Sequence, residues 1–172
     1  MKKDSTASFL QVTSSQAIIS NAITALIAPE QYDGGLAAIQ RLKGEGVLAN
    51  MHPNIGLWIS VWSGFSLIVN RVTPNHRDFG GAPSDYDLLV SAGTHVDCVL
   101  DITDLGASFS YQPGTAIAVV VKVLRHGVKC WDGGERICQA HFMKDAVRDR
   151  LGLSRPSWVN YADYIRLTYD QV

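Results

Sequence analysis

The stretch that begins at Leu57 is built from short segments rich in Val, Ile, Trp and Phe, which Gly, Pro and Asp residues separate. Segments of this length and composition predict β-strands, and the residues between them predict tight turns. Many short strands with such punctuation favour a β-sandwich or a jelly roll. We expect strands over residues 57–62, 65–72, 87–91, 96–102, 107–111, 115–125 and 136–142.

Helical periodicity is confined to the two ends of the chain. Residues 15–28 carry apolar side chains at helical spacing, after capping-type serines and before Pro29, and a second short helix is expected at about 35–43. Residues 144–152 also have a helical pattern. The sequence therefore predicts a mainly β fold of the α+β class, with a double-stranded β-helix (jelly-roll) core flanked by N-terminal helices and a short C-terminal helix.

The length of the chain favours one domain over residues 1–172. Within it we expect helical support in residues 1–50, the jelly-roll core in 57–144, and a C-terminal helix and tail in 145–172. No apolar run approaches the roughly 20 residues that a membrane span needs. The three cysteines, Cys98, Cys130 and Cys138, form no CxxC spacing and indicate reduced thiols in an intracellular protein.

The distribution of charge is compatible with a nucleic-acid partner but does not require one. The net charge is −1, yet between Lys122 and Arg155 basic residues outnumber acidic ones by eight to four. Such a region could neutralise phosphates if the charges share one face. It could equally be an ordinary solvated helix face.

Four residues have the chemistry of a metal and cosubstrate site. His76 and Asp78 form a His-x-Asp pair, and His126 follows a long apolar segment. Two histidines and one carboxylate are the ligand set of the facial triad that holds Fe(II) in oxygenases. Arg136 opens the next expected strand, and its planar guanidinium suits a carboxylate such as the distal one of 2-oxoglutarate. The alternative is a capping aspartate in a turn, with two histidines at the rim of the fold.

The ordered motifs NRVTPNHRD, YDLLVSAG, Y-x-PGT-x(9)-RHGV and GERICQAHFMKD resemble the TET/JBP group of Fe(II)- and 2-oxoglutarate-dependent nucleic-acid dioxygenases. The likeness spans roughly Trp58 to Leu151 and is greatest to the compact fungal members. It implies Fe(II) on His76, Asp78 and His126, with 2-oxoglutarate and O2 as cosubstrates. It further implies the following roles: Arg136 and Cys138 bind 2-oxoglutarate, Asn70 contacts it as in AlkB-type relatives, and Phe142 stacks on a flipped-out base.

The sequence departs from this resemblance at the base contacts. Lys144 stands where cytosine-oxidising relatives have a histidine, and Gly81 stands where relatives acting on 5-methylcytosine have Asn or Asp. Asp87 is the nearest candidate acceptor for an exocyclic amine, and the glycine leaves volume that could admit a purine. We expect oxidation of 5-methylcytosine in DNA to 5-hydroxymethylcytosine and further, with N6-methyladenine demethylation as the alternative.

Two other readings of the residues stay open. One is an oxygenase of the same fold that acts on a small molecule or a protein side chain, in which Phe142 is a core residue. The other is a non-catalytic jelly-roll binding module in which the triad is a coincidence. For the favoured function the expected partner is DNA, with RNA as a second candidate and no membrane. We expect a monomer in the nucleus.

Overall fold

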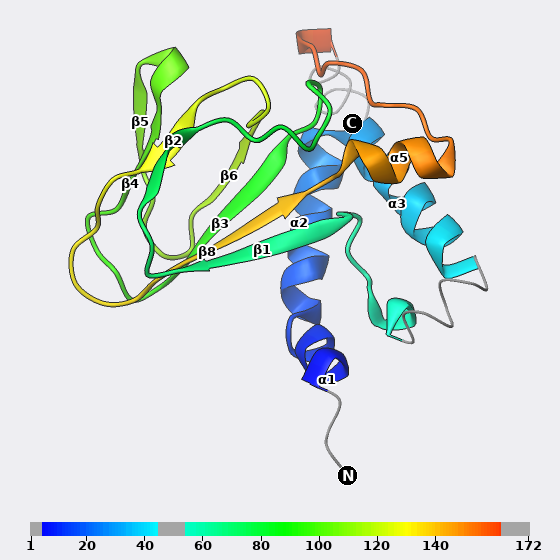
Figure 1. The fold of residues 1–172 in the computed structure, drawn as a ribbon, viewed down its shortest axis with the longest axis horizontal. Helices are drawn as coiled ribbons and strands as arrows, with labels where there is room; N and C mark the ends of the chain where they lie inside the picture. The colour runs from blue at the N-terminus through cyan, green and yellow to red at the C-terminus, as the bar shows by residue number, and fades with distance from the viewer. Residues whose placement is uncertain (1–4, 45–53, 163–172) are drawn as a thin grey trace, which may run out of the picture. The chain divides into compact units, whose positions relative to one another are not determined.

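The computed structural model describes residues 5–44 and 54–162. The chain forms two compact units, one from Met1–Ser63 with Val147–Val172 and the other from Gly64–Ala146. Whether these units form the single domain expected from the sequence stays a prediction. The candidate site residues all belong to the second unit, which is coloured from cyan-green to orange in Figure 1.

The first unit is helical. It contains α1 (Ser5–Val12), α2 (Ser14–Ile27), α3 (Pro29–Gly44), the short 3-10 helix η1 (Ile55–Leu57), and most of α5 (Asp145–Leu151). The expected helix at 15–28 is confirmed as α2, and α3 extends the helix expected at 35–43 back to Pro29, since proline is accepted in the first turn. Helix α1 was not expected. Within the described residues, no helix has both the length and the apolar character to span a membrane.

The strand expected at 57–62 does not form. The side chain of Asn21 in α2 donates to the carbonyl of Ile59 (2.9 Å) and accepts from the amide of Val61 (3.0 Å). These are backbone groups that a strand would offer to a neighbouring strand. The apolar character of this segment therefore reflects packing beside a helix, and its hydrogen bonds go to a side chain.

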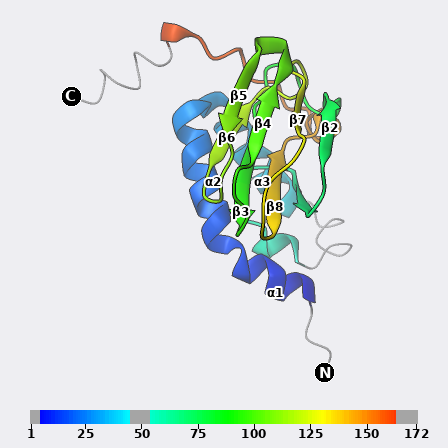
Figure 2. The ribbon, with the colours of Figure 1, turned by 90° about the vertical axis from the view of Figure 1, so that its left-hand side faces the viewer.

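The second unit is a pair of four-stranded antiparallel sheets. Figure 1 shows strands of the first sheet and Figure 2 those of the second. The first sheet has the order β1 (Gly64–Val69), β8 (Arg136–Phe142), β3 (Asp87–Gly93) and β6 (Ala116–Val119). The second has the order β2 (Thr73–His76), β7 (His126–Val128), β4 (Val99–Ile102) and β5 (Ala107–Ser110), and the 3-10 turn η2 (Thr103–Leu105) joins β4 to β5.

One apolar core lies between the two sheets. Leu89 and Cys138 enter it from the first sheet, and Leu100, Ile102 and Val128 enter it from the second. Each strand contributes alternate residues, as a half-buried strand must when one face packs and the other does not. The mainly β, jelly-roll type of fold expected from the sequence is thereby confirmed.

The long strand expected at 115–125 is wrong, because the apolar run crosses from one sheet to the other. Strand β6 ends at Val119 and pairs with β3, whereas β7 begins at His126 and pairs with β2 and β4. Between them a turn forms, in which the amides of Val123 and Leu124 both donate to the carbonyl of Val120. His126 therefore opens a strand of the second sheet and does not close a strand of the first.

The strand expected at 65–72 divides in the same way. Strand β1 ends at Val69, and Asn70 adopts a left-handed backbone conformation with φ of 48°. The chain then enters the second sheet as β2, which ends at His76. Asp78 thus lies beyond the end of β2 and is not on the same strand as His76.

Candidate active site

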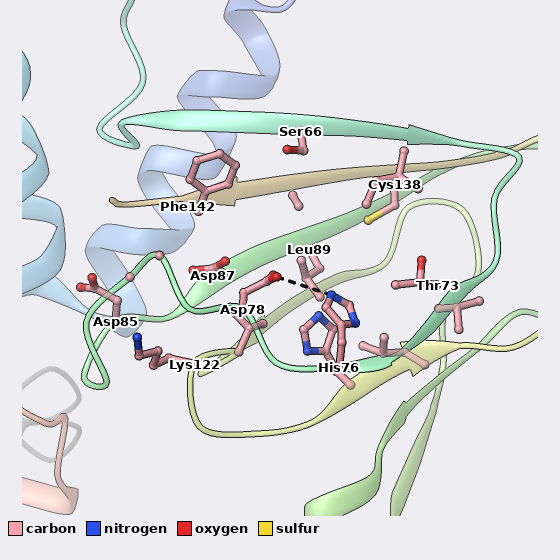
Figure 3. A pocket seen from close by; sticks show the side chains of 18 of the residues that line it. Ser66, Thr73, His76, Asp78, Asp85, Asp87, Leu89, Lys122, Cys138 and Phe142 are labelled. Carbon is pink, nitrogen blue, oxygen red and sulfur yellow. Dashed lines mark ion pairs between the residues drawn. The ribbon is translucent and has the colours of Figure 1, made fainter. Parts of the chain in front are cut away.

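A cavity of about 260 Å³ lies within the second unit, and most of the predicted site residues line it. His76, Asp78, His126, Arg136, Cys138 and Phe142 all contribute to its wall. Gly81, Asp87 and Lys144 line it as well. In Figure 3, Cys138 lies toward one end of the cavity and Phe142 toward the other, with His76 and Asp78 between them.

Two paired strands bring the histidines together. His76 ends β2 and His126 opens β7, and the two residues are direct partners in the antiparallel register. Their ring centroids are 4.4 Å apart. Asp78 reaches the same point from the loop after β2, because its amide donates to the carbonyl of Val121 (3.0 Å). Its Oδ1 lies 3.5 Å from His76 Nε2, and one ligand atom from each residue lies within 4.8 Å of the others.

Backbone carbonyls orient both imidazoles. His76 Nδ1 is 2.8 Å from the carbonyl of Pro74, and His126 Nδ1 is 3.4 Å from that of Leu124. A carbonyl only accepts, so Nδ1 must carry the proton in each contact, and the lone pair of each neutral ring resides on Nε2. Metal-ligating histidines generally have this kind of support on the second nitrogen.

The electrostatic environment keeps His126 neutral. Burial lowers the pKa of its imidazole, and the neighbouring His76 lowers it further. A neutral imidazole is the form that coordinates a metal. Two imidazoles whose Nδ1 atoms face backbone carbonyls, together with one carboxylate, therefore form a donor set that fits Fe(II).

Arg136 is a buried cation without an anion. Arg136 is only 2% exposed, and its Nη1 donates to the carbonyl of Arg71 (2.8 Å). The guanidinium carbon lies 5.6 Å from the ring centroid of Trp131. Its buried Nε has no hydrogen-bond partner, and within the described residues no carboxylate pairs with it. A guanidinium stays charged when buried, so this group fits a ligand that brings a carboxylate.

The groups around Arg136 are neutral hydrogen-bonding groups. The hydroxyl of Tyr111 lies 3.4 Å from Cys138 Sγ, and both residues are buried in the cavity wall. Burial raises the pKa of the Cys138 thiol and that of the Tyr111 phenol, so neither group is ionised near neutral pH. The cavity thus offers an incoming carboxylate the buried positive charge of Arg136, and Tyr111 and Cys138 bring no competing negative charge to this end.

Asn70 has a different position from the one expected. It does not line the cavity, and it is exposed at the end of β1. Its amide donates to the carbonyl of Arg136, and its Oδ1 accepts from the amide of Arg136, both at 2.8 Å. These contacts fix the backbone of Arg136, so a direct contact between Asn70 and 2-oxoglutarate has no support in the geometry.

The other end of the cavity combines an aromatic ring with charged groups. The Phe142 ring packs closely over Gly64, its partner on β1. A Cβ added to Gly64 would lie only 2.8 Å from the ring, so a glycine is needed there. Lys144 Nζ lies 4.7 Å from the centroid of the same ring. Arg136, Cys138 and Phe142 have the same strand parity in β8, and this explains why all three face one cavity.

Asp87 and Gly81 complete this end. Asp87 is buried, and its burial, together with the negative charges of Asp78 and Asp85, raises its pKa to about 8. A Cβ on Gly81 would lie 3.1 Å from the carbonyl of Met143. The backbone of Met143 therefore takes up part of the space that a side chain at Gly81 would occupy. The volume left for a purine is smaller than the glycine alone suggested.

Sequence reasoning missed some residues of the cavity wall. Tyr111 belongs to the Y-x-PGT motif, but no role was assigned to it. Lys122 interrupts an apolar run, and it was placed only inside the strand expected at 115–125 and among the basic residues that follow. A single charged residue directly after an apolar run was the signal that could have identified Lys122. The direction of its side chain, however, depends on where the chain crosses from one sheet to the other, and the sequence did not show this crossing.

Comparison with known proteins relates the chain to oxygenases. The Tet_JBP family model, described as the oxygenase domain of the 2OGFeDO superfamily, matches residues 2–145. A solved structure of NgTET1 in complex with 5mC DNA is similar, with 15% sequence identity, a TM-score of 0.50, and coverage of 69% of this chain and 46% of that chain. A Cupin 2 conserved barrel domain protein from Salinispora arenicola CNS-205 matches with 21% identity, a TM-score of 0.35, and coverage of 55% of this chain and 76% of that one. No curated protein matches the sequence.

These matches differ in what they support. The likeness to NgTET1 supports the fold, and this chain spans less than half of that protein's length. The family match includes most of the chain, and His76, Asp78, His126 and Arg136 all lie inside it. The superfamily uses Fe(II), 2-oxoglutarate and O2, which agrees with the donor set and with the unpaired guanidinium. The chain therefore belongs to the Tet_JBP family and is an Fe(II)- and 2-oxoglutarate-dependent dioxygenase domain.

Proposed function

We propose that this chain oxidises the methyl group of 5-methylcytosine in DNA, to 5-hydroxymethylcytosine and further, with the base flipped out of the duplex. The observation that carries the proposal is that one cavity contains three kinds of group: Arg136, the His76–Asp78–His126 cluster, and Phe142 with Asp87 and Lys144. The structure of NgTET1 in complex with 5mC DNA supports the choice of substrate class.

In this proposal the first end of the cavity holds the cofactors. His76, Asp78 and His126 would hold Fe(II), and Arg136 would bind the distal carboxylate of 2-oxoglutarate. The chemistry supplied by bound Fe(II) and 2-oxoglutarate is the reduction of O2, with one oxygen atom entering the methyl group and the other entering succinate as CO2 is released. Arg136 is buried beside the neutral Cys138 and Tyr111, and this low-dielectric setting would strengthen its attraction for the carboxylate.

The second end would hold the base. An extruded base loses its stacking neighbours, and Phe142 supplies an apolar surface that replaces one of them. The Watson–Crick edge of cytosine has acceptors and one exocyclic amine, so Lys144 would donate to an acceptor and Asp87 would accept from the amine. Asp87 can accept through its carbonyl oxygen even when the carboxyl group is protonated, which is the state favoured at neutral pH by its raised pKa.

N6-methyladenine in DNA is the second candidate substrate, and Gly81 is the observation that favours it. No side chain at this position is available to contact cytosine. The exocyclic N–H of N6-methyladenine could donate to Asp87 in the same way. Oxidation of its methyl group would give a hydroxymethyl amine, which breaks down to adenine and formaldehyde.

Nucleoside mass spectrometry distinguishes these candidates. Duplexes of one sequence that carry either 5-methylcytosine or N6-methyladenine would be incubated with the protein, Fe(II), ascorbate and 2-oxoglutarate, beside an RNA strand that carries the same bases. The proposal expects 5-hydroxymethylcytosine from the first duplex at the highest rate. Loss of N6-methyladenine alone would replace the cytosine proposal with the alternative. No oxidised base in any substrate, with 2-oxoglutarate consumed alongside a small molecule or peptide, would contradict both.

We further propose that the protein acts as a monomer in the nucleus. One cavity within the second unit contains both the cofactor groups and the base groups, so the proposed reaction needs no residue from a second copy. Light scattering at assay concentrations tests the first statement, since a dimer would double the measured mass. Imaging of the tagged protein in its own cells tests the second.

A further inference from the structure

Phe79 is an exposed aromatic residue at the mouth of the cavity. Its side chain is 76% exposed, which is unusual for a phenylalanine in a packed unit. Its neighbours Asp78 and Gly80 both line the cavity, whereas Phe79 does not. The exposed ring therefore lies outside the lining of the cavity, next to a residue of the candidate metal site.

Hydrogen bonds on both sides hold the backbone that carries this ring. The amide of Asp78 donates to the carbonyl of Val121 (3.0 Å), and Lys122 Nζ donates to the carbonyl of Phe79 (2.7 Å). The carbonyl of Gly80 accepts from the amide of Asp145 (2.9 Å). Three consecutive residues are thus tied to other segments, so the backbone that carries the exposed ring is held in place.

A positive charge accompanies the ring. Lys122 Nζ lies 5.6 Å from the centroid of Phe79, and Lys122 itself lines the cavity. Aromatic rings beside cationic groups are the combination by which proteins hold nucleic acids, since the ring stacks on bases and the cation neutralises phosphates. An apolar side chain that enters a base stack is also a known way to stabilise distorted DNA.

We propose that Phe79 is a wedge that enters the DNA duplex beside the target base and fills the space that this base leaves, while Lys122 contacts the adjacent phosphate backbone. This proposal rests on the proposed function, because a wedge is useful only if a base leaves a duplex. It adds a second aromatic contact to that site: Phe142 would meet the extruded base inside the cavity, and Phe79 would meet the bases that stay in the helix.

The experiment compares kcat/KM for 5-methylcytosine in a duplex with kcat/KM for the same sequence as a single strand. Phe79→Ala is expected to lower the ratio of duplex to single-strand efficiency by about 10-fold, in line with the cost of removing one base–aromatic stack. Phe79→Trp should keep the ratio within about twofold of the wild type, since stacking is retained. A mismatch opposite the methylated base should shrink the defect of Phe79→Ala, because less pairing must be broken.

Two controls separate this effect from damage to the metal site. Phe109→Ala removes another exposed phenylalanine, on β5 at the opposite edge of its sheet from β2, and should leave the ratio unchanged. Mn(II) affinity of Phe79→Ala should equal that of the wild type within about twofold. An unchanged ratio in Phe79→Ala, or an equal loss on both substrates, would overturn the wedge. If the wild type oxidises neither substrate, the proposed function fails and the wedge fails with it.

Discussion

The two ends of the cavity are built in different ways. At the cofactor end, backbone contacts from Pro74, Leu124 and Val121 fix His76, His126 and Asp78, and Arg136 is almost fully buried. At the base end, Lys144 is exposed, Phe142 is half-buried, and the backbone around Gly81 approaches closely. The first end is held in place by backbone contacts, whereas the second combines the buried Asp87 with the more exposed side chains of Phe142 and Lys144.

This difference has an energetic consequence. Removing one member of a buried, mutually oriented group leaves its partners without compensation, and such losses are large. Removing a contact at the rim weakens one interaction and leaves the others in place. Substitutions at the cofactor end should therefore abolish turnover, and those at the base end should change how well a substrate is held.

The largest effect is expected for His126→Ala. The variant removes one of three donor groups, so affinity for Mn(II) should fall by more than the roughly 10- to 100-fold that loss of a supporting contact costs, and turnover should be lost. Calorimetric titration with Mn(II) measures this. His141→Gln is the matched control. His141 is similarly buried, but in β8 it lies on the opposite face from Arg136 and Cys138 and does not line the cavity. Unchanged Mn(II) affinity in His126→Ala would mean that the cluster is not a metal site.

A smaller but still large effect is expected for Arg136→Lys. The variant keeps the charge but loses the planar fork, so KM for 2-oxoglutarate should rise by about 10- to 100-fold while Mn(II) affinity stays the same. Succinate formation at varied 2-oxoglutarate concentration measures the change. Arg155→Lys alters an exposed ion pair with Asp149 and should have no effect on this KM. Equal values for the two variants would place the 2-oxoglutarate site elsewhere.

At the base end, Phe142→Leu should raise KM for methylated DNA by about 10-fold and leave KM for 2-oxoglutarate unchanged, because only stacking on the base is lost. Phe65→Leu is the control. Phe65 pairs with His141 across β1 and β8 and stacks on its ring, so it lies on the face of the sheet opposite to Phe142. Steady-state assays with either substrate varied give both constants. A rise in the 2-oxoglutarate KM of Phe142→Leu would show that the two ends are not separate.

The smallest effect on turnover is expected for Asp87→Asn, which should change kcat/KM by less than about threefold near neutral pH. The pKa of Asp87 is about 8, so its side chain is neutral there, and asparagine has the same shape. Stability should respond more clearly. The folded protein keeps Asp87 protonated while the unfolded chain ionises above its ordinary pKa of 3.8, so wild-type stability is lost as the pH rises from 3.8 toward 8.

The stability advantage of Asp87→Asn over the wild type should therefore grow by at most roughly 1.4 kcal/mol per pH unit across that window, and it should level off above pH 8. Urea unfolding at pH 5, 7 and 9 would measure the difference. An advantage that stays constant with pH would mean that Asp87 is ionised in the folded protein. It would then present a full negative charge to the base.

The positions of side chains that share one regular strand could be predicted from the sequence. The positions of residues where the chain passes from one sheet to the other could not. Strand β8 was expected at 136–142, and the family resemblance assigned site roles to Arg136, Cys138 and Phe142, which the regular strand then places on one face. The crossing between Val119 and His126 was not predictable, because an apolar run looks the same whether it stays in one sheet or passes between two. The position of Phe79 was equally hidden, since exposure depends on packing by distant segments.

If both ends of this cavity serve one reaction, methylated DNA should accelerate succinate formation, and about one succinate should form for each methyl group oxidised. Succinate and 5-hydroxymethylcytosine would be measured together, with methylated and unmethylated duplexes of one sequence. Succinate formation at the same rate with either duplex, and without an oxidised base, would show that the two ends do not serve one reaction.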